Sequence, residues 1–449
     1  MNKPITLTFL LSGSLSLMAN EKPNIIMIYI DDMAYADLSC YGGDLVETSN
    51  IDQLADQGIR FTQYYSVAPI SSPSRVGLTT GMYPTRWGIR TYLQARAGNK
   101  KNQQNDFLEN RAPSMARLLK GNGYSTAHFG KWHMGGGRDV DNAPSITSYG
   151  FDEYSSTWES PDPDKALTAS DWIWSESDSI KRWNRTAYFV DKTLDFIKRN
   201  KNVPCFINMW PDDVHSPFVP DPEEVPTTEN DWESPKPFKA VLKELDVQIG
   251  RLTDGLRKIG EEENTIIIFT SDNGPHPDFG NERTGELRGK KGTLYEGGIN
   301  MPLIIRWPQK IAPGQVDETT ILTAVDFLPT LCKITKTKVD VGYPIDGEDM
   351  SKAVLGKKEL KRKKPVYWEF YRARPKNENR NQNVSPQLAI REGDWKFLVN
   401  PDGTSPELYN IKENPSETEN LIDKYPNRVA LLKNKALRWY NRSFREFVD

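Results

Sequence analysis

The stretch Asn24–Ile30, NIIMIYI, is an almost continuous apolar run, and it is followed directly by Asp31 and Asp32. A run of this length without polar alternation is typical of a strand that is buried on both faces, as in a parallel sheet covered by helices. Three further runs share the pattern: CFINMW at 205–210, TIIIFT at 265–270 and PLIIRW at 302–307. Together they predict a central, largely parallel sheet.

Amphipathic segments lie between these runs. The clearest is a stripe of apolar residues at spacings of three and four, which a helix turns toward a sheet: Leu245, Ile249, Leu252, Leu256 and Ile259. Further helices are expected at about residues 51–57, 114–120 and 187–198. The alternation of strands and helices predicts an α/β fold, with a large mixed, mostly parallel sheet flanked by helices.

The composition changes after Leu355, where GKKELKRKKP predicts a solvated linker at residues 356–365. Beyond the linker, PVYWEFY, QLAIREGDWKFLV and ELYNI indicate antiparallel strands, with turns at 392–394 and 402–403. A last helix is expected from about Asn427 to Tyr440. The chain therefore divides into a large domain at residues 20–355 and a smaller C-terminal α+β subdomain at residues 366–449.

The overall composition excludes some classes of function. The 449 residues carry a formal net charge of −3 and include 37% hydrophobic residues, so the chain can bury a large core and lacks the basic excess of a nucleic-acid-binding protein. Cys40, Cys205 and Cys332 are odd in number and widely spaced, which matches neither a disulfide framework nor a zinc site. We expect buried free thiols.

Residues 1–19 have the features of a secretory signal, with Lys3, an apolar run and the small residue Ala19 before Asn20. The apolar run is short for a membrane span. The sequence therefore predicts a soluble exported protein, periplasmic or secreted, with no stable membrane insertion.

Acidic and amide side chains follow two of the predicted strands. Asp31 and Asp32 come after the first, and Asp272 and Asn273 follow the strand at 265–270. The carboxyl ends of parallel strands meet at one edge of the sheet, where ligands bind. Either pair alone is also compatible with a turn or a helix cap. Together, three carboxylates and an amide oxygen predict a site for a hard cation, calcium or magnesium rather than zinc.

Three of the four histidines, His133, His215 and His276, lie near predicted strand ends. A single histidine is usually structural, but this distribution favours a functional site. Lys131 lies in the same segment as His133, and Lys291 lies in a glycine-punctuated loop before the strand at 302–307. That loop allows the lysine either to reach inward or to stay solvated.

The stretch APISSPSRVGLTTG, Ala68 to Gly81, predicts a helix that begins near Ser71. Serine caps helices and proline is tolerated in the first turn, so the pattern by itself needs no functional explanation. A helix N-terminus also offers backbone N–H groups and the positive end of the helix dipole, which bind anions. The rest of the chain decides between these interpretations.

Six motifs occur in the order and approximate spacing of the formylglycine-dependent sulfatases of the alkaline phosphatase superfamily, which the chain resembles: Asp31-Asp32, SSPSRVGLTTG, GYSTAHFGKWHMG, HSPF, TSDNG and GKKGTLYEGG. The similarity extends to TSNIDQLADQGIRFTQYY, AVDFLPTL and the terminal AIREGDWKFL and ELYNIKENPSETENL, and so covers nearly the whole mature chain. The resemblance implies an alkaline-phosphatase-like fold, a catalytic domain at residues 20–355 and the activity of a bacterial carbohydrate sulfatase.

The resemblance also gives Ser71 a role. A formylglycine maturation enzyme would oxidise Ser71 and read Pro73, Ser74 and Arg75 as part of its signal. The hydrated aldehyde can accept a sulfuryl group and expel sulfate by returning to the aldehyde, whereas the sulfate ester of an ordinary serine needs a difficult hydrolysis. A serine at this position implies the serine-type maturation of anaerobic bacteria or an engineered replacement of cysteine.

The metal ligands implied by the resemblance are Asp31, Asp32, Asp272 and Asn273. They would hold a calcium ion, Ca²⁺, that also touches an oxygen of the formylglycine formed from Ser71 and a sulfate oxygen. Such a cation lowers the pKa of the nucleophilic hydroxyl and offsets charge on the sulfuryl group.

The remaining catalytic roles are likewise implied by the resemblance. Arg75, Lys131 and Lys291 would supply positively charged donors around the nucleophile and the sulfate. His215 would protonate the departing alcohol, and His133 would assist breakdown of the sulfated intermediate. The family often has arginine where this chain has Asn300, which puts the support of the Lys291 loop in question.

The sequence says less about the substrate. Four tryptophans follow GFDEY and predict either a pocket that stacks sugar rings or the packing of an inserted loop: Trp158, Trp172, Trp174 and Trp183. With export, they favour a sulfated carbohydrate as substrate. Two other functions stay open, namely a phosphodiesterase or phosphonate hydrolase of the same superfamily, and a secreted protein that binds sulfated glycans while Ser71 stays unmodified.

Overall fold

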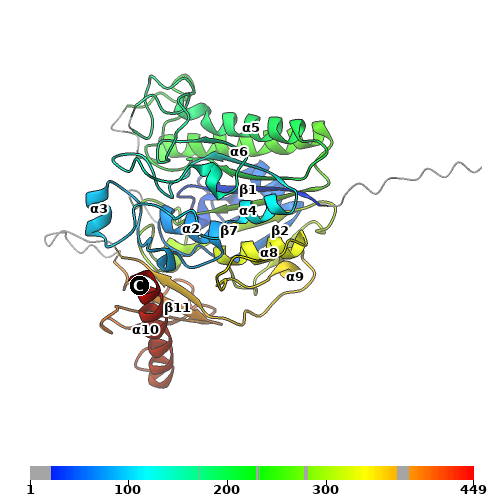
Figure 1. The fold of residues 1–449 in the computed structure, drawn as a ribbon. Helices are drawn as coiled ribbons and strands as arrows, with labels where there is room; N and C mark the ends of the chain where they lie inside the picture. The colour runs from blue at the N-terminus through cyan, green and yellow to red at the C-terminus, as the bar shows by residue number, and fades with distance from the viewer. Residues whose placement is uncertain are drawn as a thin grey trace, which may run out of the picture.

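The structure of the protein is a computed structural model that describes residues 22–170, 172–228, 231, 233–277, 282–371 and 384–448, without the side chains of 444–448. Figure 1 shows its layers. The predicted signal at residues 1–19 lies outside the described residues. Among the described residues, no helix combines the length and the apolar composition that a membrane crossing requires.

Nine strands within the described residues form the main sheet, in the order β4-β3-β5-β1-β6-β7-β2-β8, with β9 paired to β2. Their bounds are β1 Asn24–Ile30, β2 Ile59–Tyr65, β3 Ser125–Gly130, β4 Glu153–Ser156, β5 Cys205–Trp210, β6 Thr265–Ser271, β7 Asn300–Arg306, β8 Gln315–Asp317 and β9 Leu322–Thr323. Strand β7 runs antiparallel to both of its neighbours, and the other pairings are parallel. The sheet is therefore mixed and mostly parallel, as predicted.

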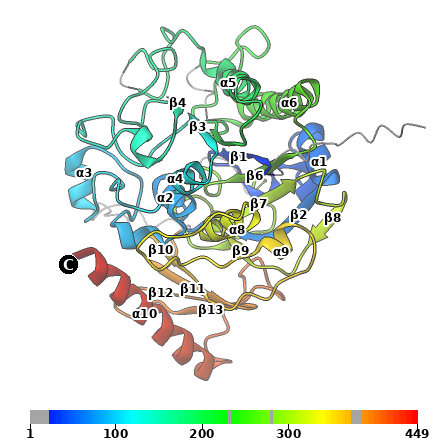
Figure 2. The ribbon, with the colours of Figure 1, turned by 45° about the vertical axis from the view of Figure 1, so that its right-hand side comes forward.

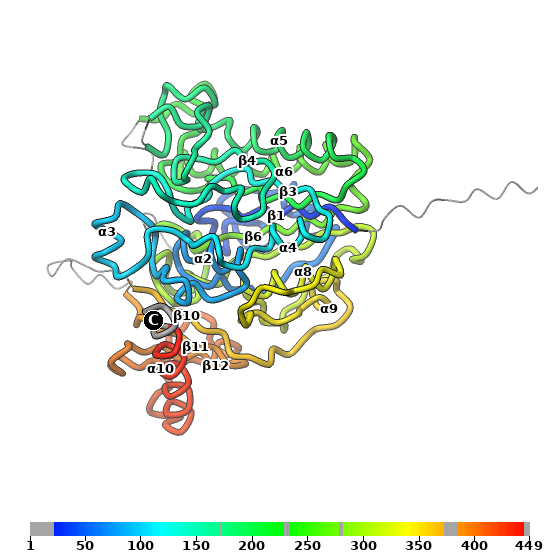
Figure 3. Tube along the Cα trace, viewed as in Figure 1, coloured from blue at the N-terminus to red at the C-terminus, as the bar shows by residue number. Residues whose placement is uncertain are grey.

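The parallel ladder places five strand ends at one edge. Ile30 of β1 pairs with Ser271 of β6, and Gly130 of β3 pairs with both Trp210 of β5 and Ser156 of β4. Because the five strands are adjacent and end in register, the residues that follow them meet above this edge. The tube in Figure 3 shows β3, β1 and β6 between α5 and α6 on one side and α2, α4 and α8 on the other.

Two helical layers cover the sheet. Helices α1 (Ser49–Asp56), α5 (Arg185–Arg199) and α6 (Pro235–Ile259) pack on one face, and α2 (Ser71–Thr80), α4 (Met115–Gly121), α8 (Phe327–Ile334) and α9 (Ser351–Val354) pack on the other. Strand β1 supplies Ile26, Ile28 and Ile30 to the first layer and Ile25, Met27 and Tyr29 to the second. This alternation explains why the strand is apolar throughout. The short helices α3 (Arg96–Lys101) and α7 (Glu296–Ile299) lie in connections.

The C-terminal subdomain is a four-stranded antiparallel sheet with one long helix. Its elements are β10 (Val366–Glu369), β11 (Leu388–Glu392), β12 (Trp395–Val399), β13 (Glu407–Asn410) and α10 (Pro426–Val448). One face of the sheet packs on α10, which crosses it in Figure 2. The other face packs on residues of the large domain such as Tyr65 and Tyr295. The two parts therefore share a buried boundary.

The predicted strands and helices are present in the structure, but further elements were not predicted. Among these are the short strands β8 and β9 and the helices α3, α7, α8 and α9. The aromatic segment at 59–65 and the short segment at 153–156 are strands β2 and β4, which the apolar runs did not indicate. The three cysteines are free thiols as predicted, with Cys205 and Cys332 buried, but Cys40 is only partly buried.

Candidate active site

Ser71 is the first residue of helix α2 and lines a cavity of about 440 Å³. The preceding Ile70 is extended, so the chain turns into the helix at Ser71. The Ser71 hydroxyl donates to Asp31 Oδ1 at 3.0 Å and lies 3.4 Å from Asn273 Oδ1. A side chain that is only 2% exposed therefore faces both the cavity and the acidic strand ends.

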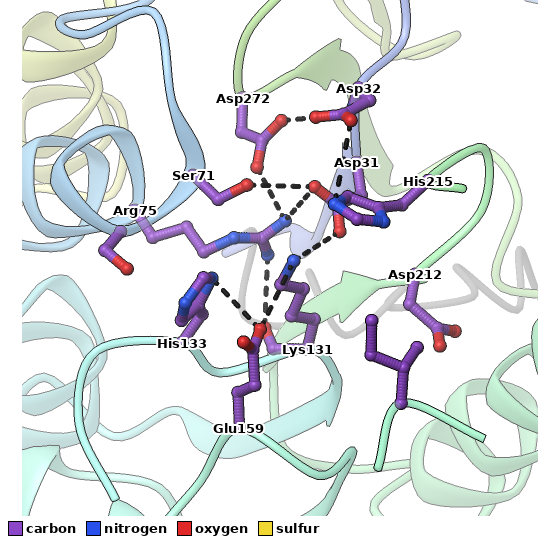
Figure 4. Close-up of polar contacts among 12 residues, drawn as sticks. Asp31, Asp32, Ser71, Arg75, Lys131, His133, Glu159, Asp212, His215 and Asp272 are labelled. Carbon is purple, nitrogen blue, oxygen red and sulfur yellow. Dashed lines mark hydrogen bonds and ion pairs between the residues drawn. The ribbon is translucent and has the colours of Figure 1, made fainter. Parts of the chain in front are cut away.

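Asp31, Asp32 and Asp272 are fully buried together at the ends of β1 and β6 (Figure 4). The Asp32 backbone has a φ of 60° and donates to Asp272 Oδ1 at 3.1 Å. Such left-handed backbone at a non-glycine residue is strained and is often found at functional sites. Burial, with the charges of Asp31 and Asp32, raises the pKa of Asp272 to about 7. Three carboxylates this close need compensating positive charge.

Three positively charged side chains supply part of that charge. Arg75 Nη2 lies 2.8 Å from Asp272 Oδ2, Lys131 Nζ lies 2.7 Å from Asp31 Oδ2, and Lys291 Nζ lies 2.7 Å from Asp32 Oδ2. Burial acts to raise the pKa of Asp31, but the charges led by Lys131 hold it well below its usual range. The three predicted cations therefore converge on the three predicted carboxylates.

Side chains that could hold a metal ion lie together at the ends of β1 and β5. Ligand atoms of Asp31, Asp32 and His215 lie within 4.8 Å of one another, which is close enough for one metal ion. Asn273 adjoins the same group, with its amide nitrogen 2.7 Å from Asp32 Oδ1. Asp272 lies beside this cluster and contacts Arg75 and the Asp32 backbone. The structure thus brings the predicted metal residues together and adds His215 to their surroundings.

His215 follows β5 on a loop that two buried arginines hold. Arg182 donates to Asp213 Oδ1 at 2.6 Å and to the Asp212 carbonyl at 2.7 Å, and Arg185 donates to Asp212 Oδ2 at 2.6 Å. His215 Nδ1 contacts the Ser216 carbonyl, which leaves Nε2 3.1 Å from Lys291 Nζ. Burial and the charge of Lys291 lower the pKa of His215 to about 4.

His133 lies on the opposite wall, after β3. Its Nε2 is 3.2 Å from the Leu93 carbonyl, and its Nδ1 is 3.2 Å from Glu159 Oε2. Both neighbours are acceptors, whereas a neutral imidazole has one N–H donor, so only the protonated ring satisfies both contacts. Burial lowers the pKa of His133 to about 3 despite the opposing charge of Glu159. The two acceptor contacts therefore favour a protonated His133, and burial opposes it.

The other two histidines, His128 and His276, have different surroundings from His133 and His215. His128 is fully buried against Trp132, Phe151 and Trp210, and burial lowers its pKa to about 3. Its surroundings are those of a structural side chain. His276 lines the cavity.

Comparisons with known proteins bear on this geometry. The family model described as Sulfatase matches residues 23–337. The chain belongs to the sulfatase family. A second model, for the C-terminal region of N-sulphoglucosamine sulphohydrolase, matches residues 289–438 of this sulfatase.

The sulfatase is similar to enzymes of bacteria and animals. It is 30% identical to an N-acetylgalactosamine-6-O-sulfatase of Bacteroides thetaiotaomicron, with 92% of each chain covered. It is 27% identical to human arylsulfatase A, covering 92% of this chain and 86% of that protein. A solved B. thetaiotaomicron structure, described in connection with the metabolism of multiple glycosaminoglycans, has a TM-score of 0.74 at 27% identity and covers 93% of this chain and 98% of that one. The protein is therefore a sulfuric ester hydrolase with an alkaline-phosphatase-like fold.

Sequence reasoning missed Glu159, whose carboxylate points toward Lys131 and His133 in the sulfatase site (Figure 4). Its carboxylate is 3.5 Å from Lys131 Nζ, 3.2 Å from His133 Nδ1 and 3.0 Å from Arg138 Nη2. Burial acts to raise the pKa of Glu159, but His133 and Lys131 lower it to about 2. An acidic residue shortly after a strand, as at Asp31, could have indicated Glu159. Strand β4, which precedes Glu159, was not predicted.

The four tryptophans have different positions in the sulfatase. Trp158 lines the cavity, whereas Trp172 is 55% exposed and packs against Trp158 with ring centroids 5.7 Å apart. Trp174 is buried and Trp183 is half-buried, away from the cavity lining. The four tryptophans therefore do not together form a pocket that stacks sugar rings.

Asn300 and a lysine of the C-terminal subdomain contact the same carboxylate. Lys396 of β12 donates to Glu296 at 2.8 Å, and the Asn300 amide lies 3.3 Å from the same carboxylate. A positive charge thus reaches Glu296, which follows the Lys291 loop, from 100 residues further along the chain. The loop is supported without an arginine at position 300.

Proposed function

We propose that this sulfatase hydrolyses a sulfate monoester on a sugar of a sulfated glycan, through formylglycine at position 71 and a bound calcium ion. The observation that carries the proposal is the position of Ser71, at a helix N-terminus in the cavity and 3.0 Å from Asp31. The names of the relatives, which include an N-acetylgalactosamine-6-O-sulfatase, support a sugar as the sulfated substrate.

The proposed metal ligands are Asp31, Asp32, Asp272, Asn273 and an oxygen of residue 71. Their oxygen atoms suit calcium, and the raised pKa of Asp272, caused by burial and the neighbouring carboxylates, supports a need for positive charge there. When bound, the ion would polarise the sulfate and favour the ionised nucleophile.

The chain's own residues position the sulfate. The N–H groups at the start of α2 and the side chains of Arg75, Lys131 and Lys291 surround the place where a sulfate would contact residue 71. All are buried or nearly so, and preorganised charges are most effective where water is excluded. Formylglycine would supply a hydrated aldehyde that accepts the sulfuryl group and releases it when the aldehyde re-forms.

Two histidines handle protons in this proposal. His215 lines the cavity, with its Nε2 3.1 Å from Lys291 Nζ, and we assign to His215 the protonation of the departing alcohol. His133 is oriented by Glu159 and Leu93 on the other wall, where it would assist release of sulfate. Protonation of a leaving group contributes about 10²- to 10⁴-fold in rate.

The proposal also includes export to the periplasm or the medium, as the first 19 residues predict, and a serine-type maturation enzyme as a partner that acts on Ser71. Without that partner, residue 71 remains a serine and can bind but not turn over a sulfate ester.

The test compares protein made with and without a serine-type maturation enzyme. Mass spectrometry of the peptide that contains residue 71 reports the modification, and release of sulfate from nitrophenyl sulfate and sulfated sugars reports activity. We expect turnover only in the modified protein, and restoration when Ser71→Cys is made with a cysteine-type enzyme. High turnover by protein with an unmodified serine would refute the mechanism, and faster turnover of phosphate diesters would favour a phosphodiesterase.

A further inference from the structure

The cavity extends beyond the residues that surround the sulfate position. Its outer wall includes Arg138, Trp158 and Glu159, from the segments that follow β3 and β4. The two segments touch at Gly136, where a Cβ would lie 2.2 Å from the Pro161 backbone nitrogen and where φ is +91°. The glycine run therefore allows the close approach that brings Arg138 to Glu159.

Arg138 and Glu159 form a hydrogen-bonded pair on this wall. Arg138 Nη2 donates to Glu159 Oε1 at 3.0 Å, and Nη1 donates to the Leu93 carbonyl at 3.2 Å. The Arg138 guanidinium lies over the Trp158 ring, with its central carbon 4.5 Å from the ring centroid. The Arg138 side chain is 26% exposed and that of Glu159 is 13% exposed, so a ligand in the cavity can reach both.

The two carboxylates of this wall are already paired with positively charged side chains. Glu159 faces Arg138, Lys131 and His133. Asp212, which also lines the cavity, lies 2.6 Å from Arg185 and 3.3 Å from Arg182. Aromatic and aliphatic side chains also line the cavity, among them Tyr92, Ile173 and Phe370. A second anion placed here would compete with Glu159 for Arg138 and would face the Glu159 carboxylate. A hydroxyl group can instead donate to Glu159 and accept from Arg138 at the same time.

We propose that Arg138 and Glu159 bind a hydroxyl group of the sugar that carries the scissile sulfate, with Trp158 holding the guanidinium in place. The preferred substrate is then a sugar with no other negative charge on that ring, a neutral hexose or N-acetylhexosamine rather than a uronic acid or a disulfated sugar. This inference rests on the proposed sulfatase reaction at Ser71 and specifies the substrate class of the same site.

The experiment uses matured protein and measures competitive inhibition of nitrophenyl sulfate hydrolysis. The inhibitors are N-acetylgalactosamine 4-sulfate, the 6-sulfate and the 4,6-disulfate, which differ by one charged group. We expect the better monosulfate to bind at least about tenfold more tightly than the disulfate, because like charges placed together cost more than that. Inhibition constants report binding whether or not the sugar is turned over.

Glu159→Gln keeps the shape of the side chain and removes its charge. Glu159→Gln should bring the inhibition constants of the monosulfate and the disulfate closer together. This effect is independent of any change in the hydrolysis rate that the substitution causes through His133. The matched control is Glu153→Gln on β4, whose side chain pairs with Arg199 at 2.8 Å away from the cavity and should leave the preference unchanged.

The outcomes separate this inference from the proposed function. Absence of nitrophenyl sulfate hydrolysis by protein with formylglycine at position 71 would remove the proposed function itself. Hydrolysis with equal inhibition by mono- and disulfated sugars, with tighter binding of the disulfate, or with no inhibition by the monosulfates, would overturn the hydroxyl subsite alone. An unchanged preference in Glu159→Gln would do the same.

Discussion

Two clusters of buried charged side chains differ in what surrounds them. The open cluster comprises Asp31, Asp32, Asp272, Arg75, Lys131 and Lys291, and it borders the cavity beside Ser71. The closed cluster comprises Glu296, Lys396 and Glu417, whose ion-paired side chains are 0% exposed, with Lys396 Nζ 2.8 Å and 3.0 Å from the two carboxylates. The closed cluster joins the large domain to the C-terminal subdomain.

A perturbed pKa does not distinguish the two clusters. Burial is the leading cause that raises the pKa of Asp272 to about 7 in the open cluster and that of Glu417 to about 7 in the closed one. Displaced pKa values are common at functional sites, but structural ion networks share them. What distinguishes the open cluster is access to a cavity and a candidate nucleophile at hydrogen-bond distance.

The largest expected effect is on turnover, in the open cluster. His215→Ala should lower the turnover of sugar sulfates by about 10²- to 10⁴-fold, because a sugar alkoxide needs a proton when it leaves. Nitrophenyl sulfate, whose leaving group hardly needs one, should be affected far less. Steady-state kinetics on both substrates measure the difference. His276→Ala, which removes another histidine of the cavity lining, is the control. Equal losses on both substrates would mean that His215 mainly binds sulfate.

The next effect is on stability, in the closed cluster. Lys396→Met should destabilise the fold by about 3–5 kcal/mol, because it leaves Glu296 and Glu417 buried without a cation. Chemical denaturation measures the change. Lys435→Met removes a partly exposed pair with Glu392 in the same subdomain and should cost only about 0–1 kcal/mol. A Lys396→Met protein as stable as the parent would show that the closed cluster does not hold the subdomains together.

The smallest effect concerns pH. The pKa of Glu417 is about 7 in the folded state and lies near 4.5 when the carboxyl is free, mainly because burial raises it. Between these values the folded form keeps a proton that the unfolded form has lost, so stability should fall as pH rises from about 4.5 to 7. Glu417→Gln should flatten this dependence in melting temperatures recorded across that range. A variant with the same slope as the parent would assign the dependence to other groups.

The sequence predicted the parts of the fold that carry a strong local signal. Strands β1, β5 and β6 are buried on both faces, so their apolar runs are visible without knowledge of their partners. Strand β4 has only four residues, Glu153–Ser156, of which two are partly exposed, and it exists because it pairs with β3. Tertiary pairing of this kind leaves little trace in the sequence.

Long-range packing also limited what the sequence could predict about the active site. Ser71, the acidic strand ends, the lysines and the histidines could be named because motifs mark them, although their roles came from the family resemblance. Glu159 follows the unrecognised β4, and Lys396 reaches Glu296 from a separate sheet. No spacing in the sequence predicts that Glu159 lies in the site or that Lys396 contacts Glu296. The missing residues are thus those whose position depends on long-range packing.

The burial of α2 has a consequence for the order of events in the cell. All ten residues of Ser71–Thr80 are buried, including the Ser-x-Pro-Ser-Arg stretch that a maturation enzyme would read. An enzyme that oxidised Ser71 would therefore have to act before this helix is buried in the folded protein. Enclosure waits for distant partners, since Asn24 of β1 pairs with Thr265 of β6, and such non-local pairing is slow. Under the proposed maturation, the fraction of active molecules depends on the relative rates of oxidation and folding, and we expect a variant that folds faster to be less active.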